Sequence, residues 1–457
     1  LRMNTLIAIV GLGVFCLVAE IFNFRKAIIP VSVIALLALF GLTITDNLPQ
    51  VAGDYSNMIE ETSFSKTFSS LFILLTSLLL VLSNNVYKNT SKISDFISIK
   101  IFMLSGAIAM VSFNNMAMFF LGIEVLSIAL YVLAGSHRLD IRSNEAGMKY
   151  FLMGSFASGI LLFGIAMLYG ATGTFDVPTL YDASISANTE YWFYIGVILI
   201  TIGMLFKIAA VPFHFWAPDV YEGAPLIVTA FMSTFAKVVA MAAFFKLITI
   251  LNSYMAYSYE IVILVISILS MTIGNIMALR QNSVKRILAF SGISHAGFLL
   301  MTLLNIGAAA NNLLYYSASY ALAGVAAFSV LIYVCKNEDD DKIDNFNGLA
   351  KRNPLMAVIM SLALLSMAGI PILSGFFAKL FLLNQVISAG FLVLAIVAIV
   401  NSMISVYYYF RVILAMYTKD SVKQEVEHGS EFYIVGIVAA VLLIVLGLFP
   451  DTILHLI

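Results

Sequence analysis

The sequence predicts an all-α protein that crosses a membrane about 14 times. Of its 457 residues, 61% are hydrophobic and 11% are charged, whereas a typical soluble domain carries roughly 25% charged residues. The apolar residues form long runs without alternating polarity, which favours helices over the strands of a barrel. The charged residues gather between these runs and sum to a formal net charge of -1. Membrane lipid is therefore the expected environment, and nucleic acid is not an expected partner.

Each predicted span is one apolar run, because a helix needs about 20 apolar residues to cross hydrocarbon. No small-residue cleavage site follows the first run, so we expect a retained span there. Cys16 and Cys335 lie in or beside such runs without ligand spacing, which predicts neither a disulfide nor a metal site. The predicted spans are 5–22, 28–44, 67–82, 97–113, 115–135, 147–169, 192–217, 226–250, 259–279, 286–304, 311–335, 355–385, 388–411 and 433–449.

The positive charges predict an orientation. The loops that follow spans 1, 3, 5, 9, 11 and 13 hold most of the 24 Lys and Arg residues, and Lys100 is counted with the second of them. The opposite face carries acidic residues instead, Glu60 and Glu61 among them. Loops rich in Lys and Arg stay in the cytoplasm. We therefore expect both termini on the periplasmic side of a bacterial inner membrane.

Several ionisable side chains fall inside the spans. Counting ~1.5 Å per residue places a group of them at similar depth: Glu124 at ~14 Å in span 5, Lys207 at ~22 Å in span 7, Lys237 at ~17 Å in span 8 and His295 at ~14 Å in span 10. The midplane of a ~30 Å hydrocarbon core lies at ~15 Å. A charge in this layer is costly and typically serves ion or proton transfer.

Two alternatives temper this interpretation. A single histidine in a membrane is as often an interhelical hydrogen-bonding residue as a proton carrier. Lys246 lies four residues before the end of its span, where a lysine can extend its ammonium to the interface instead. The row of groups at one depth nevertheless favours a proton relay.

Two long spans contain a proline that interrupts the helix near a lysine. Pro212 follows Lys207 in span 7, and Pro371 precedes Lys379 in span 12. A proline removes a helical hydrogen bond, and paired interrupted helices are typical of transporters built from inverted repeats. We therefore expect two inverted five-helix repeats, each with a broken helix; ordinary proline kinks are the alternative. The expected segments are 1–96, 97–250 (spans 4–8), 259–411 (spans 9–13) and 412–457.

Weaker candidates lie towards the predicted cytoplasmic side. Glu145 and Lys149 are four residues apart, which predicts a helix-surface ion pair; lining a proton entrance is the alternative. His214 and Asp219 follow Pro212 and either line the inner half of a path or cap the broken helix.

The sequence has no motif for a bound cofactor. It contains no Gly-rich phosphate loop, dinucleotide fingerprint or cysteine cluster for an iron–sulfur centre, so no cofactor is expected in this chain. The loop 337–352 is acidic but lacks calcium-loop spacing, and we expect it to be a connector or a docking surface.

Three stretches carry a resemblance to a known family: FLGIEVLSIALYVLAG (120–135), KIAAVPFHFWAPDVYEGAP (207–225) and KRILAFSGISHAGF (285–298). They resemble the antiporter-like, proton-translocating subunits of respiratory complex I, the bacterial NADH–quinone oxidoreductase. Two features are similar to the subunit N branch. Lys379 stands where the M branch has a glutamate, and the chain stops at Ile457 without the lateral helix of the L branch.

The resemblance implies roles for individual positions. Glu124 matches the glutamate of span 5, Lys207 the lysine of the broken span 7, Lys237 the central lysine of span 8, and Lys379 the terminal basic residue of span 12. It also implies partners, namely the antiporter-like subunit M and small membrane subunits such as K and J. NAD(H) and quinone would be used by the complex and not bound by this chain.

The expected function is proton translocation driven by electron transfer elsewhere in a complex. We expect Glu124 close to Lys207, holding it protonated, and a proton route through Lys237 and His295 to Lys379. Two other classes stay open. Multi-subunit cation/proton antiporters share the motifs, and a structural scaffold could use the polar row only to join helices.

Overall fold

The computed structural model describes residues 4–22, 24–45, 57–87, 92–180, 191–251, 257–335, 341–420 and 429–457. Every secondary-structure element in these residues is a helix, which confirms the predicted fold class. The elements of the first half are α1 (Asn4–Ile21), α2 (Arg25–Ile44), α3 (Ser63–Tyr87), α4 (Ile93–Ser112), α5 (Met116–Ala134), α6 (Ile141–Thr172), α8 (Tyr191–Lys207), α9 (Trp216–Gly223), α10 (Leu226–Ala230), the π-helical turn η1 (Phe231–Ala236) and α11 (Lys237–Leu251). Those of the second half are α12 (Tyr257–Leu279), α13 (Val284–Leu300), α14 (Ala309–Val334), α15 (Leu349–Arg352), α16 (Pro354–Ala368), α17 (Ser374–Ser388), α18 (Leu392–Thr418), α19 (Glu431–Leu448) and α20 (Asp451–Leu454).

Every predicted span corresponds to one of these helices or to an adjoining set of them. Eleven helices of the described residues are long and apolar enough to cross a membrane. Three shorter apolar helices account for the remaining spans: Thr5–Ile21, Tyr191–Lys207 and Pro354–Ala368. The chain is therefore a multi-pass membrane protein.

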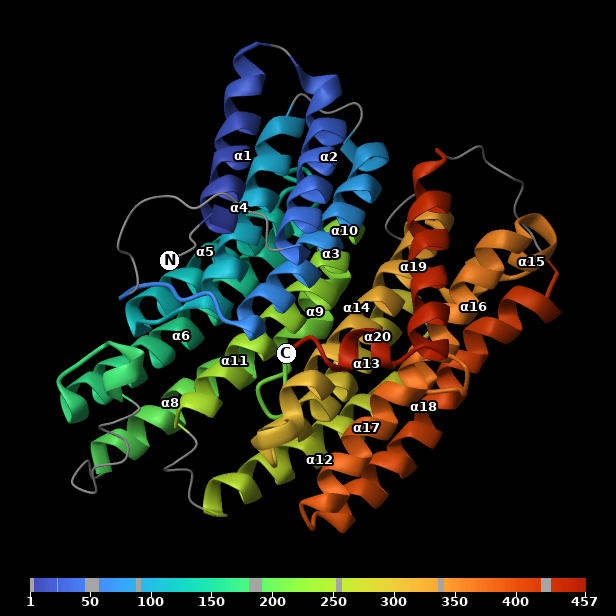
Figure 1. Cartoon of the computed structure of the whole chain (residues 1–457). Helices are drawn as coiled ribbons and strands as arrows, with labels where there is room; N and C mark the ends of the chain where they lie inside the picture. Colours follow the sequence, from blue (N-terminus) through green and yellow to red (C-terminus); the bar gives the residue numbers. More distant parts are fainter. Residues whose placement is uncertain are drawn as a thin grey trace.

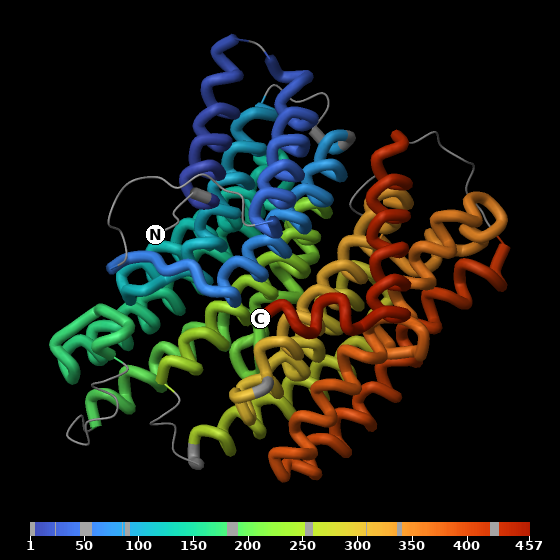
Figure 2. Tube along the Cα trace, viewed as in Figure 1, coloured from blue at the N-terminus to red at the C-terminus, as the bar shows by residue number. Residues whose placement is uncertain are grey.

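The two halves of the chain lie side by side. In Figures 1 and 2 the blue and green helices form one half, and the yellow to red helices form the other. The same order of elements occurs twice. Three unbroken helices, α4 to α6 in the first half and α12 to α14 in the second, are followed by a broken helix and then by a fifth helix. The broken elements are α8/α9 in the first half and α16/α17 in the second. The hairpin of α1 and α2 packs against α4 and α3, and α19 packs against α14 and α16.

The ends of α1, α3, α5, α12, α14 and α18 lead into the Lys/Arg-rich loops. We call the side of the molecule with these loops the basic-loop side. Its assignment to the cytoplasm, and the division into four segments, stay predictions.

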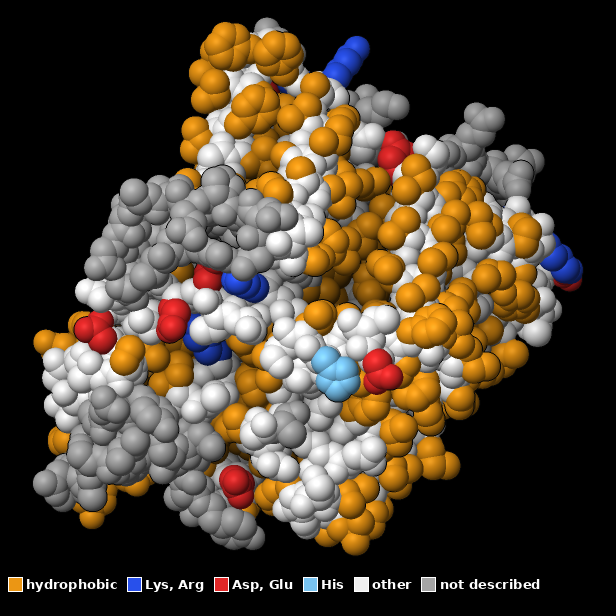
Figure 3. Space-filling view, viewed as in Figure 1, with side chains coloured by type: hydrophobic (Ala, Val, Ile, Leu, Met, Phe, Trp, Pro, Cys, Tyr) orange, Lys and Arg blue, Asp and Glu red, His pale blue; other side chains and the backbone are white. Residues whose placement is uncertain are grey.

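Burial separates the central helices from the peripheral ones. In α13, 94% of the residues in the apolar membrane-spanning stretch are buried inside the protein, against 28% in α2 and 39% in α18. Hydrophobic side chains, orange in Figure 3, cover much of the face shown. Phe156, Val393 and Met403 are more than half exposed. Groups on α11, α13 and α14 are thus shielded from lipid.

Glycines bring neighbouring helices into close contact. A Cβ added to Gly106 of α4 would lie 2.9 Å from the carbonyl oxygen of Gly122 in α5. A Cβ added to Gly164 of α6 would lie 2.8 Å from the carbonyl oxygen of Gly196 in α8. Small residues at such crossings are what allows membrane helices to approach closely. The close approach of α4 to α5 and of α6 to α8 positions the polar face described below.

Both predicted breaks are present, and both begin before their proline. Helix α8 ends at Lys207, where Ala209 adopts a left-handed φ of 56° and the Ala210 amide donates to the Leu205 carbonyl. Helix α16 ends in the same way: Gly369 has a φ of 87°, and the Ile370 amide donates to the Leu365 carbonyl. This is the Schellman cap of a helix C-terminus. The two interruptions are therefore capped helix ends, and the prolines prevent the helices from resuming at once.

One lysine was placed wrongly by the sequence. Lys100, counted with a loop, is the eighth residue of α4 and has 0% of its surface exposed. The predicted span begins only at residue 97, so Lys100 stood near its end, whereas the helix already begins at Ile93. Lys100 is thus an additional lysine inside the membrane-spanning part.

Candidate functional site

The ammonium group of Lys207 is held by three hydroxyl groups. Its Nζ donates to Ser127 Oγ at 2.7 Å and to Tyr131 Oη at 3.2 Å, both on α5. It also donates to Ser158 Oγ of α6 at 3.1 Å. Because Lys207 is the last residue of α8, the break places it where α5 and α6 can reach it. The hydroxyls replace water around a charge that the helices bury.

Glu124 belongs to the same cluster but does not touch Lys207. It lies three residues before Ser127, one turn away on α5. The carboxylate and the ammonium interact electrostatically, yet the ion pairs of the described residues include none between them within 4.0 Å. Glu124 Oε1 is buried and has no hydrogen-bond partner among the described residues. The expected proximity therefore takes the form of an electrostatic interaction without contact.

Lys237 occupies the centre of the molecule. It follows η1, is 1% exposed, and donates from Nζ to the carbonyl oxygen of Gly292 in α13 at 2.6 Å. A Cβ on Gly292 would lie 2.8 Å from that Nζ. A glycine is therefore needed at this position for the lysine to reach the backbone. A π-helical turn inside a helix frequently marks a functional site.

His295 lies in a network of tyrosines. Its Nδ1 is 2.7 Å from Tyr316 Oη, and its Nε2 is 3.3 Å from Tyr409 Oη. Tyr409 is also hydrogen-bonded to Ser291. The Tyr320 ring lies 4.8 Å from the imidazole, centre to centre, with the planes tilted by 42°. Its hydroxyl donates to the Ser233 carbonyl in η1 at 2.8 Å.

Sequence reasoning missed these tyrosines. Tyr316 and Tyr320 are four residues apart on α14 and so face one direction. That spacing was a usable signal, but a tyrosine carries no charge and does not stand out in an apolar span.

Lys379 caps the first half of the broken span 12. Its Nζ donates to the carbonyl oxygen of Ala368, the last residue of α16, at 2.9 Å. A helix C-terminus carries unpaired carbonyls and a partial negative charge, which stabilise a cation. A small cavity between Lys379 and His295 is also lined by Tyr316, Tyr320 and Ser366. The centre of a water molecule can occupy about 10 Å³ of it, which is roughly the space that one water needs.

These contacts form two clusters. Lys237, His295 and Lys379 gather around α13, whereas Lys207 and Glu124 lie between α5, α6 and α8. Among the described residues, direct hydrogen bonds do not join the two clusters. A proton passing between them needs water or side-chain movement.

The weaker candidates form a charged network on the basic-loop side. Lys149 pairs with Glu145 at 2.7 Å, as the spacing predicted, and with Asp219 of α9 at 3.5 Å. Arg286 of α13 pairs with Glu222 and lies 3.9 Å from Asp219. These side chains are 27–59% exposed. The network therefore ties α6, α9 and α13 together.

His214 and Lys246 are placed differently. His214 is 6% exposed, and its Nδ1 has no hydrogen-bond partner within the described part of the chain. Lys246 donates from Nζ to the carbonyls of Val111 and Phe113 at the end of α4, at 3.0 and 2.7 Å. Lys246 therefore caps a helix end, as Lys379 does.

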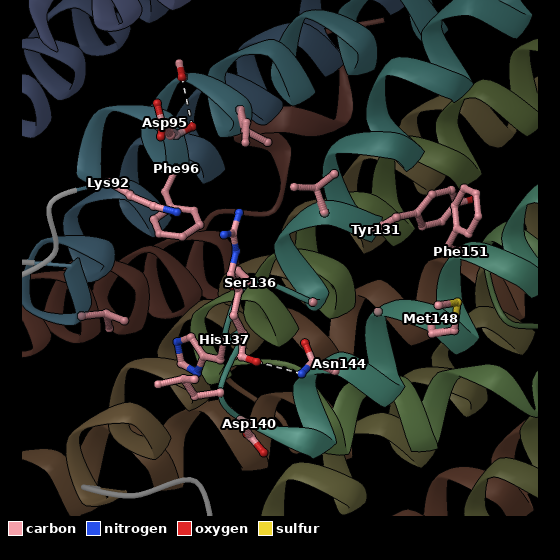
Figure 4. A pocket seen from close by; sticks show the side chains of 18 of the residues that line it. Lys92, Asp95, Phe96, Tyr131, Ser136, His137, Asp140, Asn144, Met148 and Phe151 are labelled. Carbon is pink, nitrogen blue, oxygen red and sulfur yellow. Dashed lines mark hydrogen bonds between the residues drawn. The ribbon is translucent and has the colours of Figure 1, made fainter.

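A large cavity reaches the Lys207 cluster from the basic-loop side. It measures about 1570 Å³ and lies between α1, α4, α5 and α6. In Figure 4, Lys92, Asp95, His137 and Asp140 lie away from Tyr131, which is beside Phe151. The same Tyr131 hydroxyl accepts from Lys207. No group of three or more His, Cys, Asp or Glu that could hold a metal is found in the described ranges.

Paired broken helices around a buried row of lysines define an antiporter-like membrane subunit. The sequence profile described as "NADH:quinone oxidoreductase/Mrp antiporter, TM" matches residues 112–405. A relative in Flavobacterium johnsoniae, named NADH-quinone oxidoreductase subunit N, is 60% identical over 99% of this chain and 100% of its own length. The chain belongs to the NADH-quinone oxidoreductase subunit N family.

Solved structures have the same fold. A chain in the structure titled "Respiratory complex I from Thermus thermophilus with bound Aureothin" superposes with a TM-score of 0.85 at 27% identity, covering 98% of each chain. A chain of the Mrp complex from Dietzia sp. superposes with a TM-score of 0.83 at 22% identity, covering 99% of this chain and 95% of the other. The second likeness concerns the fold alone.

Proposed function

We propose that this chain is a proton-translocating membrane subunit of an NADH–quinone oxidoreductase. The observation that carries the proposal is a set of groups contributed by different helices: Lys237, His295 and Lys379 are buried, and Lys207 is partly buried. Each makes polar contacts inside the protein. Ionisable residues held in this way within membrane spans characterise proton relays. The name of the Flavobacterium relative supports the proposal that the driving reaction is electron transfer from NADH to quinone.

The proposed sequence starts at Glu124. Its negative charge favours the protonated form of Lys207. When the carboxylate is neutralised or moves away, Lys207 releases a proton, which reaches the neutral amine of Lys237 through water. Lys237 passes it to the tyrosine network around His295, and from there it crosses the small cavity to Lys379 and leaves on the far side. The hydroxyl groups of Ser127, Tyr131 and Ser158 take the place of water around the Lys207 ammonium during each cycle.

The energy comes from outside this chain. Moving one proton against 100 mV requires about 2.3 kcal/mol, and the proposal assigns the oxidation of NADH and the reduction of quinone to other subunits. Its proposed membrane partners are subunit M and small subunits such as K and J. The proposed location is the bacterial inner membrane, with both termini on the periplasmic side.

Substitution of the central lysine tests the function. Lys237→Gln should preserve assembly and strongly lower the number of protons pumped per NADH oxidised by inverted membrane vesicles. Lys351→Gln is the matched control, because Lys351 is 68% exposed and, among the described residues, its ion pair is with a surface aspartate, Asp420. Unchanged pumping in Lys237→Gln and in Lys207→Gln, with intact complex, would leave only a scaffold role.

A cation/proton antiporter subunit is the second candidate, supported by the shared fold of the Mrp complex. Affinity purification of the tagged chain separates the two. Iron–sulfur and quinone-reducing subunits should accompany it in the first case, and only further antiporter subunits in the second.

A further inference from the structure

Lys100 is a buried cation that the proposed route does not use. It lies in α4 with no exposed surface, and its Nζ donates to Ser83 Oγ of α3 at 2.8 Å. The same Nζ lies 5.2 Å from the ring centre of Phe231. A membrane protein rarely retains a lysine at such a position without a function, because an apolar side chain would fill the space at much lower cost.

Polar groups lie between Lys100 and the basic-loop side. Asn84, the residue after Ser83, donates from Nδ2 to Glu431 Oε1 at 2.7 Å. Glu431 is the first residue of α19, and Asn84 is in the last turn of α3. Both helix ends adjoin Lys/Arg-rich loops. The half-buried Glu431 and Asn84 thus lie between Lys100 and the end of α3, one residue along the chain from the Ser83 that holds the ammonium.

On its inner side, Lys100 faces the element that carries the central lysine. Phe231 is the first residue of η1, and Lys237 follows the last. The two are six residues apart, about 9 Å along a helix. Two carbonyls of this turn accept hydroxyl groups: Met232 from Tyr221 at 3.1 Å, and Ser233 from Tyr320 at 2.8 Å. Hydroxyl groups of two tyrosines therefore lie against η1.

We propose that Lys100 carries protons to Lys237 along a second branch from the basic-loop side, independent of Lys207. In the transfer, an N–H bond of protonated Lys100 breaks and an N–H bond forms on the neutral amine of Lys237, with water as the carrier. Lys100 is then reprotonated past Ser83, Asn84 and Glu431. Phe231 holds the protonated ammonium over its ring between transfers. The inference rests on the proposed function and adds a second entrance to it.

Three substitutions at Lys100 distinguish proton transfer from a structural role. Arginine preserves the positive charge but does not release its proton, histidine can still exchange one, and methionine preserves only the bulk. The complete complex, in inverted vesicles, is assayed for protons pumped per NADH oxidised. The part of this ratio that passes through this chain is the part lost in Lys237→Gln. Lys100→Met and Lys100→Arg should each lower that part by roughly half, because one of two branches is lost, and Lys100→His should stay closer to the wild type.

Each other outcome overturns the inference. Wild-type pumping in Lys100→Met shows that no proton passes here, and wild-type pumping in Lys100→Arg shows that only the charge matters. Ser83→Ala serves if the Lys100 variants do not assemble: it removes the hydroxyl next to the ammonium and should also lower the ratio, whereas an unchanged ratio contradicts the branch. Lys207→Met is measured in parallel. If it pumps normally, the proposed function fails; if it alone is defective, only the second branch fails.

Discussion

Replacing Gly292 by alanine should separate proton transfer from stability. The added Cβ would lie 2.8 Å from Lys237 Nζ and 3.1 Å from Tyr320 Oη, and its next neighbour is Lys237 Cε at 4.0 Å. The Lys237 ammonium is the end of a flexible side chain, and the contact with the rigid Tyr320 is only slightly shorter than an ordinary one. The lysine can therefore move away, but it then loses its bond to the Gly292 carbonyl, now 2.6 Å long.

The size of the effect follows from that bond. A hydrogen bond from a charged donor contributes about 1.5–3 kcal/mol. Each 1.36 kcal/mol changes a rate by about tenfold. If Lys237 must return to this carbonyl in every cycle, pumping should fall by about 10- to 100-fold. The helix itself should gain up to ~1 kcal/mol, because alanine is a better helix former than glycine.

The assay is proton uptake into inverted membrane vesicles, compared with the amount of assembled complex on a native gel. Gly159→Ala is the matched control: Gly159 is also inside a helix, α6, and nothing lies within 4 Å of an added Cβ. Normal pumping by Gly292→Ala would refute the role of this contact. A loss of assembled complex would refute the claim that only the lysine has to move.

Three further predictions concern other parts of the molecule. Glu124→Gln keeps the shape but removes the charge that acts on Lys207, and should slow pumping by roughly tenfold or more with unchanged assembly; equal pumping of the variant and the wild type would argue against this role. Arg286→Ala removes the pair with Glu222, and thermal unfolding in detergent should show a loss below about 1 kcal/mol that disappears in high salt; a large, salt-independent loss would contradict a surface network. Burial raises the pKa of the loop residue Asp341 above its ordinary value of 3.8, although its hydrogen bond from Ser283 lowers it in part. When folding raises the pKa of an acid, the folded state becomes less stable as pH rises from the ordinary pKa through the raised one. Asp341→Asn should therefore gain stability over the wild type across that pH range. A gain confined to lower pH would be inconsistent with this sign.

The spans and their interruptions were readable from the sequence because both depend on local chemistry. Continuous apolar runs specify membrane helices, and prolines beside Lys207 and Lys379 mark helices that cannot continue. Depth along a helix follows from a constant rise per residue. The layer containing Glu124, Lys207, Lys237 and His295 could therefore be proposed before any contact was known.

The partners of these groups could not be read in the same way. Depth gives a position along one axis, but the neighbour of a side chain depends on how each helix is rotated and which helix packs against it. Only the packing shows that serine and tyrosine hydroxyls, rather than Glu124, contact Lys207. The same applies to Lys246, which binds carbonyls of α4 from a distant part of the chain.

By itself, the sequence determined the class of the protein and the course of the chain through the membrane, and it predicted the depth of most charges, since hydropathy and helical rise act within single segments. The tertiary structure alone decided which backbone carbonyl receives Lys237, which hydroxyls surround His295, and that Lys100 is enclosed. These outcomes come from contacts between helices far apart in the chain, and burial of a charge is a property of all its neighbours together.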